Sequence, residues 1–138
     1  MLDPNQSLPP VEYSLMPSGP FSRLTGPHYF LERDGVYAML IHIEDRHLDD
    51  AGVADCGMLI TISDNANTGA AELLTGGAPV VTVSLNCDYT ASAGTGWLAV
   101  EARVSHRSGD LLFTNCDIRS GRELVMTSSA ICKIQAAR

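Results

Sequence analysis

The sequence is poor in charge, in aromatic residues and in long hydrophobic runs. Charged residues make up 18% of its 138 residues and aromatic residues 6%, while hydrophobic residues reach 45%, which excludes disorder as the main state. No apolar stretch approaches the roughly 20 residues that span a membrane, and the N-terminus lacks the basic and apolar regions of a secretory signal. We therefore expect one folded domain, located in the cytoplasm and without a membrane partner.

Basic residues are also scarce. Nine Lys and Arg stand against sixteen Asp and Glu, which gives a formal net charge of -7 at pH 7. Nucleic acids and anionic lipids bind to basic surfaces, so this composition excludes both as partners.

The four cysteines follow no pattern typical of a bridge or a metal site. Cys56, Cys87, Cys116 and Cys132 include no Cys-x-x-Cys pair and no spacing with His that suits zinc. We expect reduced, mostly buried thiols and no metal.

Prolines divide the chain into an arm and a domain. Five of the seven lie in residues 1–20, which predicts an N-terminal arm with at most a short helix and turn. Residues 21–138 are predicted to form the single domain. Its first strands are expected at 28–32 and 36–43, on either side of the hairpin signal Asp34-Gly35.

One long helix is predicted over residues 56–74. Thr75-Gly76-Gly77, with Pro79 beyond, is typical of a helix end. The apolar residues of this segment lie on more than one face, so we expect a helix that is buried nearly all round.

After the helix the apolar residues follow a period of two, which indicates strands. The alternating apolar positions of the first strand are Val81, Val83, Leu85 and Cys87. Further strands are predicted at 98–104, 111–117 and 124–134. Four consecutive antiparallel strands would bury one face, and the helix is the only element available to cover it. The fold class is therefore α+β, an antiparallel sheet of about six strands wrapped around one long central helix. Its open edges favour a homodimer through strand pairing.

Residues 47–66 carry a motif that resembles a known family. They read HLDDAGVADCGMLITISDNA, which is similar to the signature H-x-N-x-x-G-x-x-H-G-G-x-L-x-T-x-x-D-x-A of the PaaI-like hotdog-fold acyl-CoA thioesterases. The matching residues are His47, Gly52, Gly57, Leu59, Thr61, Asp64 and Ala66. The likeness continues at residues 26–29, 81–89 and 130–134. Asp49, Asp55 and Cys56 depart from it, standing where the family has Asn, His and Gly.

The resemblance implies a hotdog fold that hydrolyses acyl-CoA or aryl-CoA thioesters at a dimer interface, with water activated by a helix aspartate. It also implies a homodimer, or a dimer of dimers, and CoA only as part of the substrate, without another cofactor. Because the three departures lie where the chemistry would be, the alternative is a non-catalytic hotdog module that binds an acyl-CoA or another apolar ligand.

Asp64 is the central candidate of the site. An aspartate in the middle of an apolar helix is costly unless it is neutralised, paired or hydrogen-bonded. We expect it to be the base that activates water, or the nucleophile, rather than a structural carboxylate bonded to Thr61 or Thr68. Thr68 lies one turn later on the same face, where its hydroxyl could hold the attacking water or bond back to the carbonyl of Asp64.

The helix N-terminus supplies the second half of the expected site. The N–H groups of Cys56 and Gly57 are candidate donors to an oxyanion. Cys56 and Asp64 are separated by about 12 Å along the helix axis, so one helix cannot present both groups to one carbonyl. The site must combine two subunits, as the resemblance also implies.

Two further carboxylates are expected near that terminus. Asp55 suits the N-cap of the helix, where it would compete with a substrate oxygen for the same N–H groups. Asp49 either faces the cleft, where it would repel the other carboxylates, or is solvated in its loop. The thiol of Cys56 is a candidate nucleophile, but a small packed thiol in place of Gly is the simpler interpretation.

Four residues are expected to contact the substrate: Thr82, His47, Asn65 and Arg107. Thr82 matches a position where relatives carry a hydroxyl near the site. Arg107 belongs to a late group of basic residues that could meet CoA phosphates.

Overall fold

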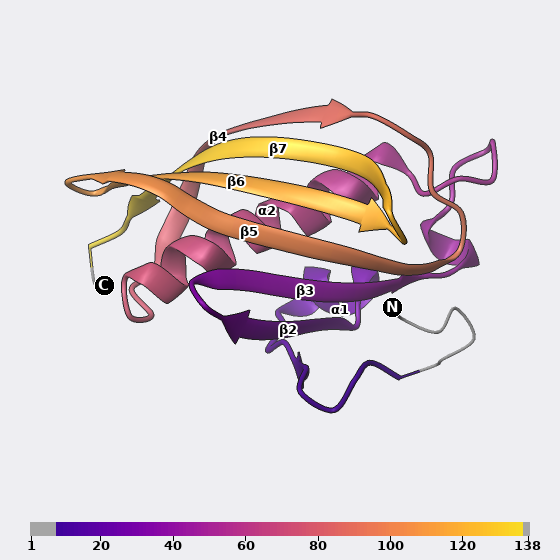
Figure 1. The fold of residues 1–138 in the computed structure, drawn as a ribbon, viewed down its shortest axis with the longest axis horizontal. Helices are drawn as coiled ribbons and strands as arrows, with labels where there is room; N and C mark the ends of the chain where they lie inside the picture. Colours follow the sequence, from indigo (N-terminus) through magenta and orange to yellow (C-terminus); the bar gives the residue numbers. More distant parts are fainter. Residues whose placement is uncertain (1–7, 137–138) are drawn as a thin grey trace.

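The computed structural model describes residues 8–136, and its helices and strands are shown in Figure 1. The strands are β1 (Ser14–Leu15), β2 (His28–Arg33), β3 (Val36–Ile43), β4 (Val80–Tyr89), β5 (Gly96–Ser108), β6 (Leu111–Ser120) and β7 (Glu123–Ile134). The helices are α1 (Pro20–Thr25) and α2 (Cys56–Leu74), with the 3-10 turn η1 (Asp45–His47) before α2. From β2 onward the order is the predicted one: strand, strand, long helix and four strands.

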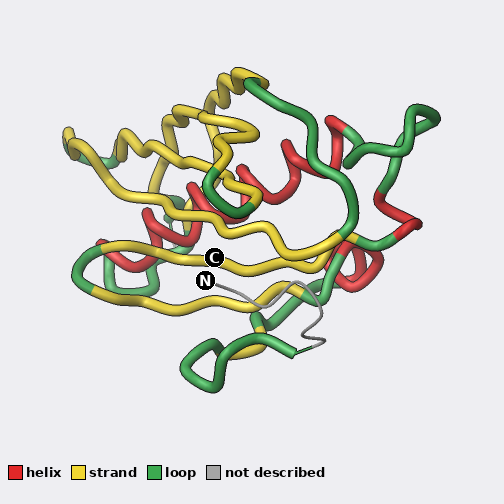
Figure 2. Tube along the Cα trace, turned by 45° about the vertical axis from the view of Figure 1, so that its right-hand side comes forward, coloured by secondary structure: helices red, strands yellow, loops and turns green. Residues whose placement is uncertain are grey.

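The strands form one antiparallel sheet in the order β1-β2-β3-β5-β6-β7-β4, and it curves around α2 (Figure 2). The α+β class and the sheet wrapped around one central helix are thus confirmed. The additional seventh strand is β1, where the arm pairs with β2 through Ser14 and Leu15. The remainder of the predicted arm, residues 1–7, lies outside the described residues.

The four strands after the helix are contiguous and antiparallel in the sheet, but they do not follow chain order. Strand β4 pairs with β7, while β5 pairs with β3 and β6. Local patterns in the sequence predict each strand, but they do not predict which strands pair. The connection from β4 to β5 leads from one end of the sheet to a position between β3 and β6. Strand β4 therefore ends the sheet.

The first hairpin confirms the turn signal. Asp34 and Gly35 have φ values of 52° and 76°, so both occupy the left-handed region that a two-residue turn of this kind requires. The turn pairs Arg33 with Val36 and sets the register of β2 on β3.

Helix α2 packs on the sheet with one side only. Its buried residues are Met58, Leu59, Ile62, Ser63, Ala66, Asn67, Gly69, Ala70 and Ala71. Ile60 and Leu74 are 40% and 54% exposed, so the expected burial nearly all round is wrong for the single chain. Apolar side chains near both ends of the helix are thus left uncovered. Within residues 8–136, no helix is long and apolar enough to cross a membrane.

Strand β4 departs from the predicted alternation. Its pairing with β7 shifts between Thr82 and Ser84, which is a β-bulge. The extra residue reverses the alternation, so Thr82 lies on the helix side opposite the buried Cys132. Val81 and Val83, the first two alternating apolar positions, are instead 38% and 58% exposed.

All four cysteines are free thiols, but they are not all buried. Cys116 and Cys132 are buried, Cys87 is half-buried and Cys56 is exposed. Burial raises the pKa of Cys116 to about 12, so this thiol stays protonated.

Candidate active site

A hydrogen bond between α2 and β4 holds the carboxylate of Asp64. The hydroxyl of Thr82 donates to Oδ1 of Asp64 across 2.5 Å. Asp64 is half-buried, and none of the salt bridges among residues 8–136 involves it. A neutral donor therefore orients the carboxylate without cancelling its charge, and the bulge in β4 is what brings that donor to this face.

Thr68 and Asn65 lie beside Asp64 on the helix. The hydroxyl of Thr68 donates to the backbone carbonyls of Asp64, at 2.9 Å, and Asn65, at 3.1 Å. This is the back-bonded arrangement, which leaves the lone pairs of the hydroxyl available to accept from a water. The side-chain nitrogen of Asn65 is buried and has no partner within residues 8–136.

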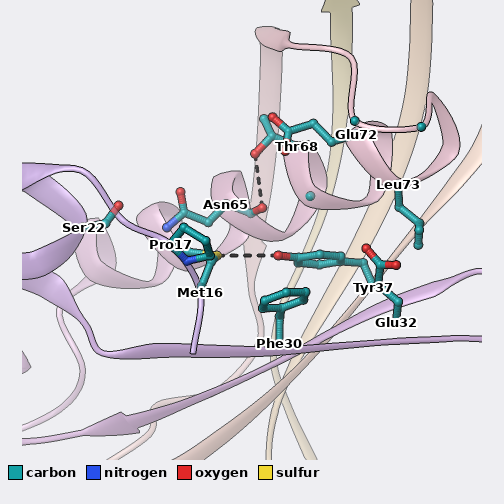
Figure 3. Close-up of a pocket in the computed structure, with 13 residues that line it drawn as sticks. Met16, Pro17, Ser22, Phe30, Glu32, Tyr37, Asn65, Thr68, Glu72 and Leu73 are labelled. Carbon is teal, nitrogen blue, oxygen red and sulfur yellow. Dashed lines mark hydrogen bonds between the residues drawn. The ribbon is translucent and has the colours of Figure 1, made fainter. Parts of the chain in front are cut away.

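A cavity of about 590 Å³ opens along the helix next to these two residues (Figure 3). Phe30 and Tyr37 form one wall, with ring centroids 5.7 Å apart and planes 13° from parallel. Among residues 8–136, the Tyr37 hydroxyl has one hydrogen-bond partner, the sulfur of Met16 at 3.5 Å. Burial raises the pKa of Tyr37 to about 12. The volume and the aromatic wall suit a small or medium-sized organic group.

The N-terminus of α2 is capped as expected. Oδ1 of Asp55 accepts from the N–H of Gly57 at 2.7 Å. The Gly57 N–H is thus occupied in this arrangement. Within residues 8–136, neither the Cys56 N–H nor the Met58 N–H makes a hydrogen bond, so Cys56 offers a free donor at the first position of the helix.

Tyr89 was missed by the sequence analysis. Its hydroxyl donates to the carbonyl of Cys56 at 3.2 Å, which joins the end of β4 to the start of α2. The alternation of Leu85 and Cys87 continues to Tyr89, and this was the signal that could have found it.

His47 and Asp49 both hold the loop before α2. Nδ1 of His47 accepts from the Glu44 N–H at 2.9 Å, and Nε2 lies 2.8 Å from the Thr25 carbonyl, to which it donates. Burial lowers the pKa of His47 and keeps the ring neutral. Both ring nitrogens are therefore engaged within the chain rather than offered to a ligand. The carboxylate of Asp49 accepts from the N–H groups of Ala51 and Val53, so it closes its own loop.

Arg107 lies apart from these groups, near the turn between β5 and β6. Its Nε donates to the carbonyl of Gly109 at 3.1 Å, and the residue is exposed. In the part of the chain that the structure describes, no three His, Cys, Asp or Glu side chains lie close enough to hold a metal ion.

Comparisons with known proteins give one consistent result. The family model described as the thioesterase superfamily matches residues 52–127, more than half of the chain. A curated protein of Pseudomonas aeruginosa, named "Putative esterase PA0474", is 30% identical over 122 residues, which cover 85% of this chain and 90% of the relative.

Solved structures show the same fold at lower identity. The conserved protein PA5202 of Pseudomonas aeruginosa matches with a TM-score of 0.80 and 22% identity, over 86% of this chain and 95% of that one. The PaaI protein of the phenylacetic acid degradation operon of E. coli matches with a TM-score of 0.77 and 14% identity, over 85% of each chain.

Proposed function

The chain belongs to the thioesterase superfamily, and we propose that it hydrolyses acyl-CoA or aryl-CoA thioesters at a site shared by two subunits. Membership confirms the expected family and the class of enzyme, a thioester hydrolase. We call Asp64 with Thr82 one half site, and the helix N-terminus at Cys56 the other. The observation that carries the rest of the proposal is that both half sites contact β4. Thr82 binds Asp64 at one end of this strand, and Tyr89 binds the backbone of Cys56 at the other.

Strand β4 is the element through which two copies would pair. It ends the sheet of the described residues, and Val83 and Tyr89 on it are 58% and 44% exposed, next to the 40% exposed Ile60 of α2. An uncovered apolar edge of this kind pairs readily with a second strand. In an antiparallel pair around a two-fold axis, the Thr82 end of one strand lies beside the Tyr89 end of the other. Asp64 would then face the helix N-terminus of the partner subunit. The separation of about 12 Å between Cys56 and Asp64 along one helix, which corresponds to about eight residues of helical rise, is then no obstacle. The assembly is a homodimer or a dimer of dimers.

In the reaction, Asp64 acts as the general base, oriented by Thr82. The carboxylate takes a proton from a water whose oxygen attacks the thioester carbonyl carbon. The resulting oxyanion accepts from the Cys56 N–H of the partner subunit and is stabilised by the helix dipole. When the carbonyl reforms, the C–S bond breaks and the CoA sulfur takes the proton from Asp64. CoA is needed only as part of the substrate, and we place the enzyme in the cytoplasm.

The acyl or aryl group occupies the cavity of about 590 Å³ beside Thr68 and Asn65. The stacked rings of Phe30 and Tyr37 offer a flat apolar wall to it, which favours an aryl group or a medium acyl chain over a short one. The Asn65 amide is available for a polar atom of the substrate.

The test is thiol release from a panel of short, medium and aryl acyl-CoA thioesters, with variants of each half site. Asp64→Asn is expected to lower kcat by about 100-fold or more, because it removes the base. Cys56→Pro removes only the N–H, since proline fits the first helical position and Asp55 already has the φ of -60° and ψ of 137° that precede proline. It should lower kcat by about 100-fold, whereas the control Cys56→Ala, which keeps the N–H, should not. Full activity of Asp64→Asn would show that the assignment of the base is wrong.

One observation favours a second function, a non-catalytic module that binds an acyl-CoA. The Asp55 carboxylate occupies the Gly57 N–H and places negative charge where the oxyanion would form. This alternative predicts that the wild-type protein binds CoA thioesters by calorimetry without turnover, and that Asp55→His gains turnover.

A further inference from the structure

We propose that Ser128 is a positioning residue for the reaction. It belongs to a buried hydrogen-bonded group, Ser63 and Asn67 of α2 with Ser128 of β7, which we call the serine latch. The latch sets the rotation of α2 about its own axis and thereby aims Asp64 at Thr82. The kinetic part of this inference rests on the proposed function, while the structural part does not.

The contacts of the latch are short and connected. The hydroxyls of Ser63 and Ser128 lie 2.6 Å apart. The side-chain nitrogen of Asn67 donates to the Ser128 hydroxyl at 3.1 Å and to the Ser63 carbonyl at 2.9 Å. Ser63 and Asn67 are 0% exposed and Ser128 is 5% exposed. The side-chain oxygen of Asn67 is the one buried atom of the latch without a partner among residues 8–136. Buried polar groups are costly unless they are hydrogen-bonded, so the bonds that the latch does make favour the arrangement that keeps them.

The latch residue Ser63 and the carboxylate residue Asp64 are consecutive on the helix. Ser63 and Asp64 point about 100° apart around the axis, because a helix has 3.6 residues per turn. Ser63 reaches β7 through Ser128, and Asp64 reaches the neighbouring β4 through Thr82. Two directional bonds to two adjacent strands define one rotation of the helix.

Apolar packing alone would define that rotation less well. The large buried side chains of α2, Met58, Leu59 and Ile62, lie before the latch, whereas the buried apolar residues after it are the small Ala66, Ala70 and Ala71. Hydrophobic contact is also non-directional. The latch therefore adds directional bonds where the apolar packing of the helix is weakest.

A small rotation is enough to break the contact of Asp64. Side-chain atoms lie about 6 Å from the helix axis, so a rotation of about 20° moves the carboxylate by about 2 Å. The 2.5 Å bond from Thr82 cannot survive such a shift. Because misplacement of a reacting group by about 1 Å can cost about 100-fold in rate, the latch should affect kcat far more than KM.

The latch carries no charge that could act on Asp64 directly. Its members are hydroxyls and an amide. The adjacent Cys116 thiol is also uncharged, because burial raises its pKa to about 12, although the hydrogen bond from Ser128 opposes this rise. Ser128 therefore acts through geometry and not through the local field.

The experiment compares Ser128→Thr with Ser128→Val, which have the same shape and differ only in the hydroxyl. Ser128→Val is expected to lower kcat by about 10-fold to 100-fold, with KM within about twofold, and Ser128→Thr to restore kcat. The matched control is Ser129→Ala, because the neighbouring Ser129 is exposed on the opposite face. Equal losses in Ser128→Thr and Ser128→Val, or no loss in Ser128→Val, would overturn the proposal. If Ser128→Val does not fold, Ser128→Ala takes its place.

A double-mutant cycle tests the route of the effect. In a Thr82→Val background, Ser128→Val should cost little further kcat, because the bond that the latch protects is already absent. Additive losses would mean that Ser128 acts elsewhere. A crystal structure of Ser128→Val gives a readout that needs no activity. We expect Thr82 Oγ1 and Asp64 Oδ1 to separate beyond hydrogen-bonding distance. An unchanged distance contradicts the latch, whereas a wild-type enzyme inactive on every thioester contradicts only the proposed function.

Discussion

Single residues of the motif divide into those whose polar groups remain available to a ligand and those whose polar groups are bonded within the chain. Asp64 keeps a half-buried carboxylate held by Thr82, and Cys56 keeps a free N–H at the helix start. The side chains of Asp49, His47 and Asp55 instead bond to the backbone of their own loop or helix. A motif identifies the positions near a site, but the hydrogen bonds decide which of them remain available to a substrate.

Gly69 shows how one missing side chain shapes the cavity. A Cβ at this position would lie 2.4 Å from Cε1 of Tyr37, a ring that is 6% exposed and stacked on Phe30. Gly69→Ala improves helix propensity by about 1 kcal/mol, but overpacking against a rigid ring costs about 1–3 kcal/mol. The net loss is up to about 2 kcal/mol, so we expect a lower melting temperature, by up to roughly 8 °C, in calorimetry.

The control for this prediction is Gly19→Ala, because a Cβ at Gly19 meets nothing within 4 Å. Its melting temperature should stay close to that of the wild type. Adding Tyr37→Leu should recover part of the loss in Gly69→Ala. A rise in melting temperature for Gly69→Ala alone would show that the ring moves freely.

At the scale of elements, α1 is fastened by polar contacts instead of by a core. None of its residues is buried. His47 donates to the Thr25 carbonyl, Thr25 Oγ1 lies 3.1 Å from Nε2 of the buried His28, and the Arg46 guanidinium donates to the carbonyls of Leu24 and Gly26. The docking of this helix therefore depends on two neutral imidazoles.

Stability should fall in mild acid for this reason. Burial lowers the pKa of His28 and of His47 below the ordinary value near 6.5, and the neighbouring imidazole and guanidinium add to the effect at His28. As the pH falls through about 6.5, the unfolded chain binds protons before the folded chain does, so the free energy of unfolding decreases. Stability is full above this pH and is lost as the pH falls toward the lowered values. Urea unfolding at about pH 7.5 and about pH 5.5 measures the difference.

His47→Gln, which keeps a donor for Thr25 without a titrating ring, should reduce this pH dependence. His106→Gln, on the exposed part of β5, should leave it in place. Equal stability of the wild-type protein at both pH values would contradict the expectation.

At the scale of the whole molecule, the proposed site needs two groups that one chain cannot bring together, because Cys56 and Asp64 are about 12 Å apart along α2. The proposed dimer predicts complementation between inactive variants. Asp64→Asn and Cys56→Pro are each expected to be inactive as pure dimers. In a mixed dimer, the Asp64 of the Cys56→Pro chain meets the intact N–H of the Asp64→Asn chain, so one of the two sites is complete.

Random reassembly of equal amounts should therefore recover about a quarter of the wild-type activity, since about half of the dimers are mixed and each has one good site. Thiol release after co-expression measures this recovery. Samples mixed without subunit exchange are the control and should stay inactive. A monomer in sedimentation experiments, or no recovery in the co-expressed sample, would rule out the shared site.

The amino-acid sequence by itself determined the elements and the family. The turn at Asp34, the helix from Cys56 and the strands around it follow from turn chemistry, end signals and periodicity, all of which act between residues close in the chain. The motif at residues 47–66 made Asp64 the candidate for the central carboxylate of the site. These signals are local, and so they can be read without the fold.

Only the tertiary structure decided which groups meet. The bulge at Val83 reversed the face of Thr82, and the crossing to β7 made β4 an edge. Ser63 and Ser128, 65 residues apart, came together in the core with no sign in the sequence. Such contacts depend on strand order, register and helix rotation, which are set by the packing of the whole chain and not by any one segment of it.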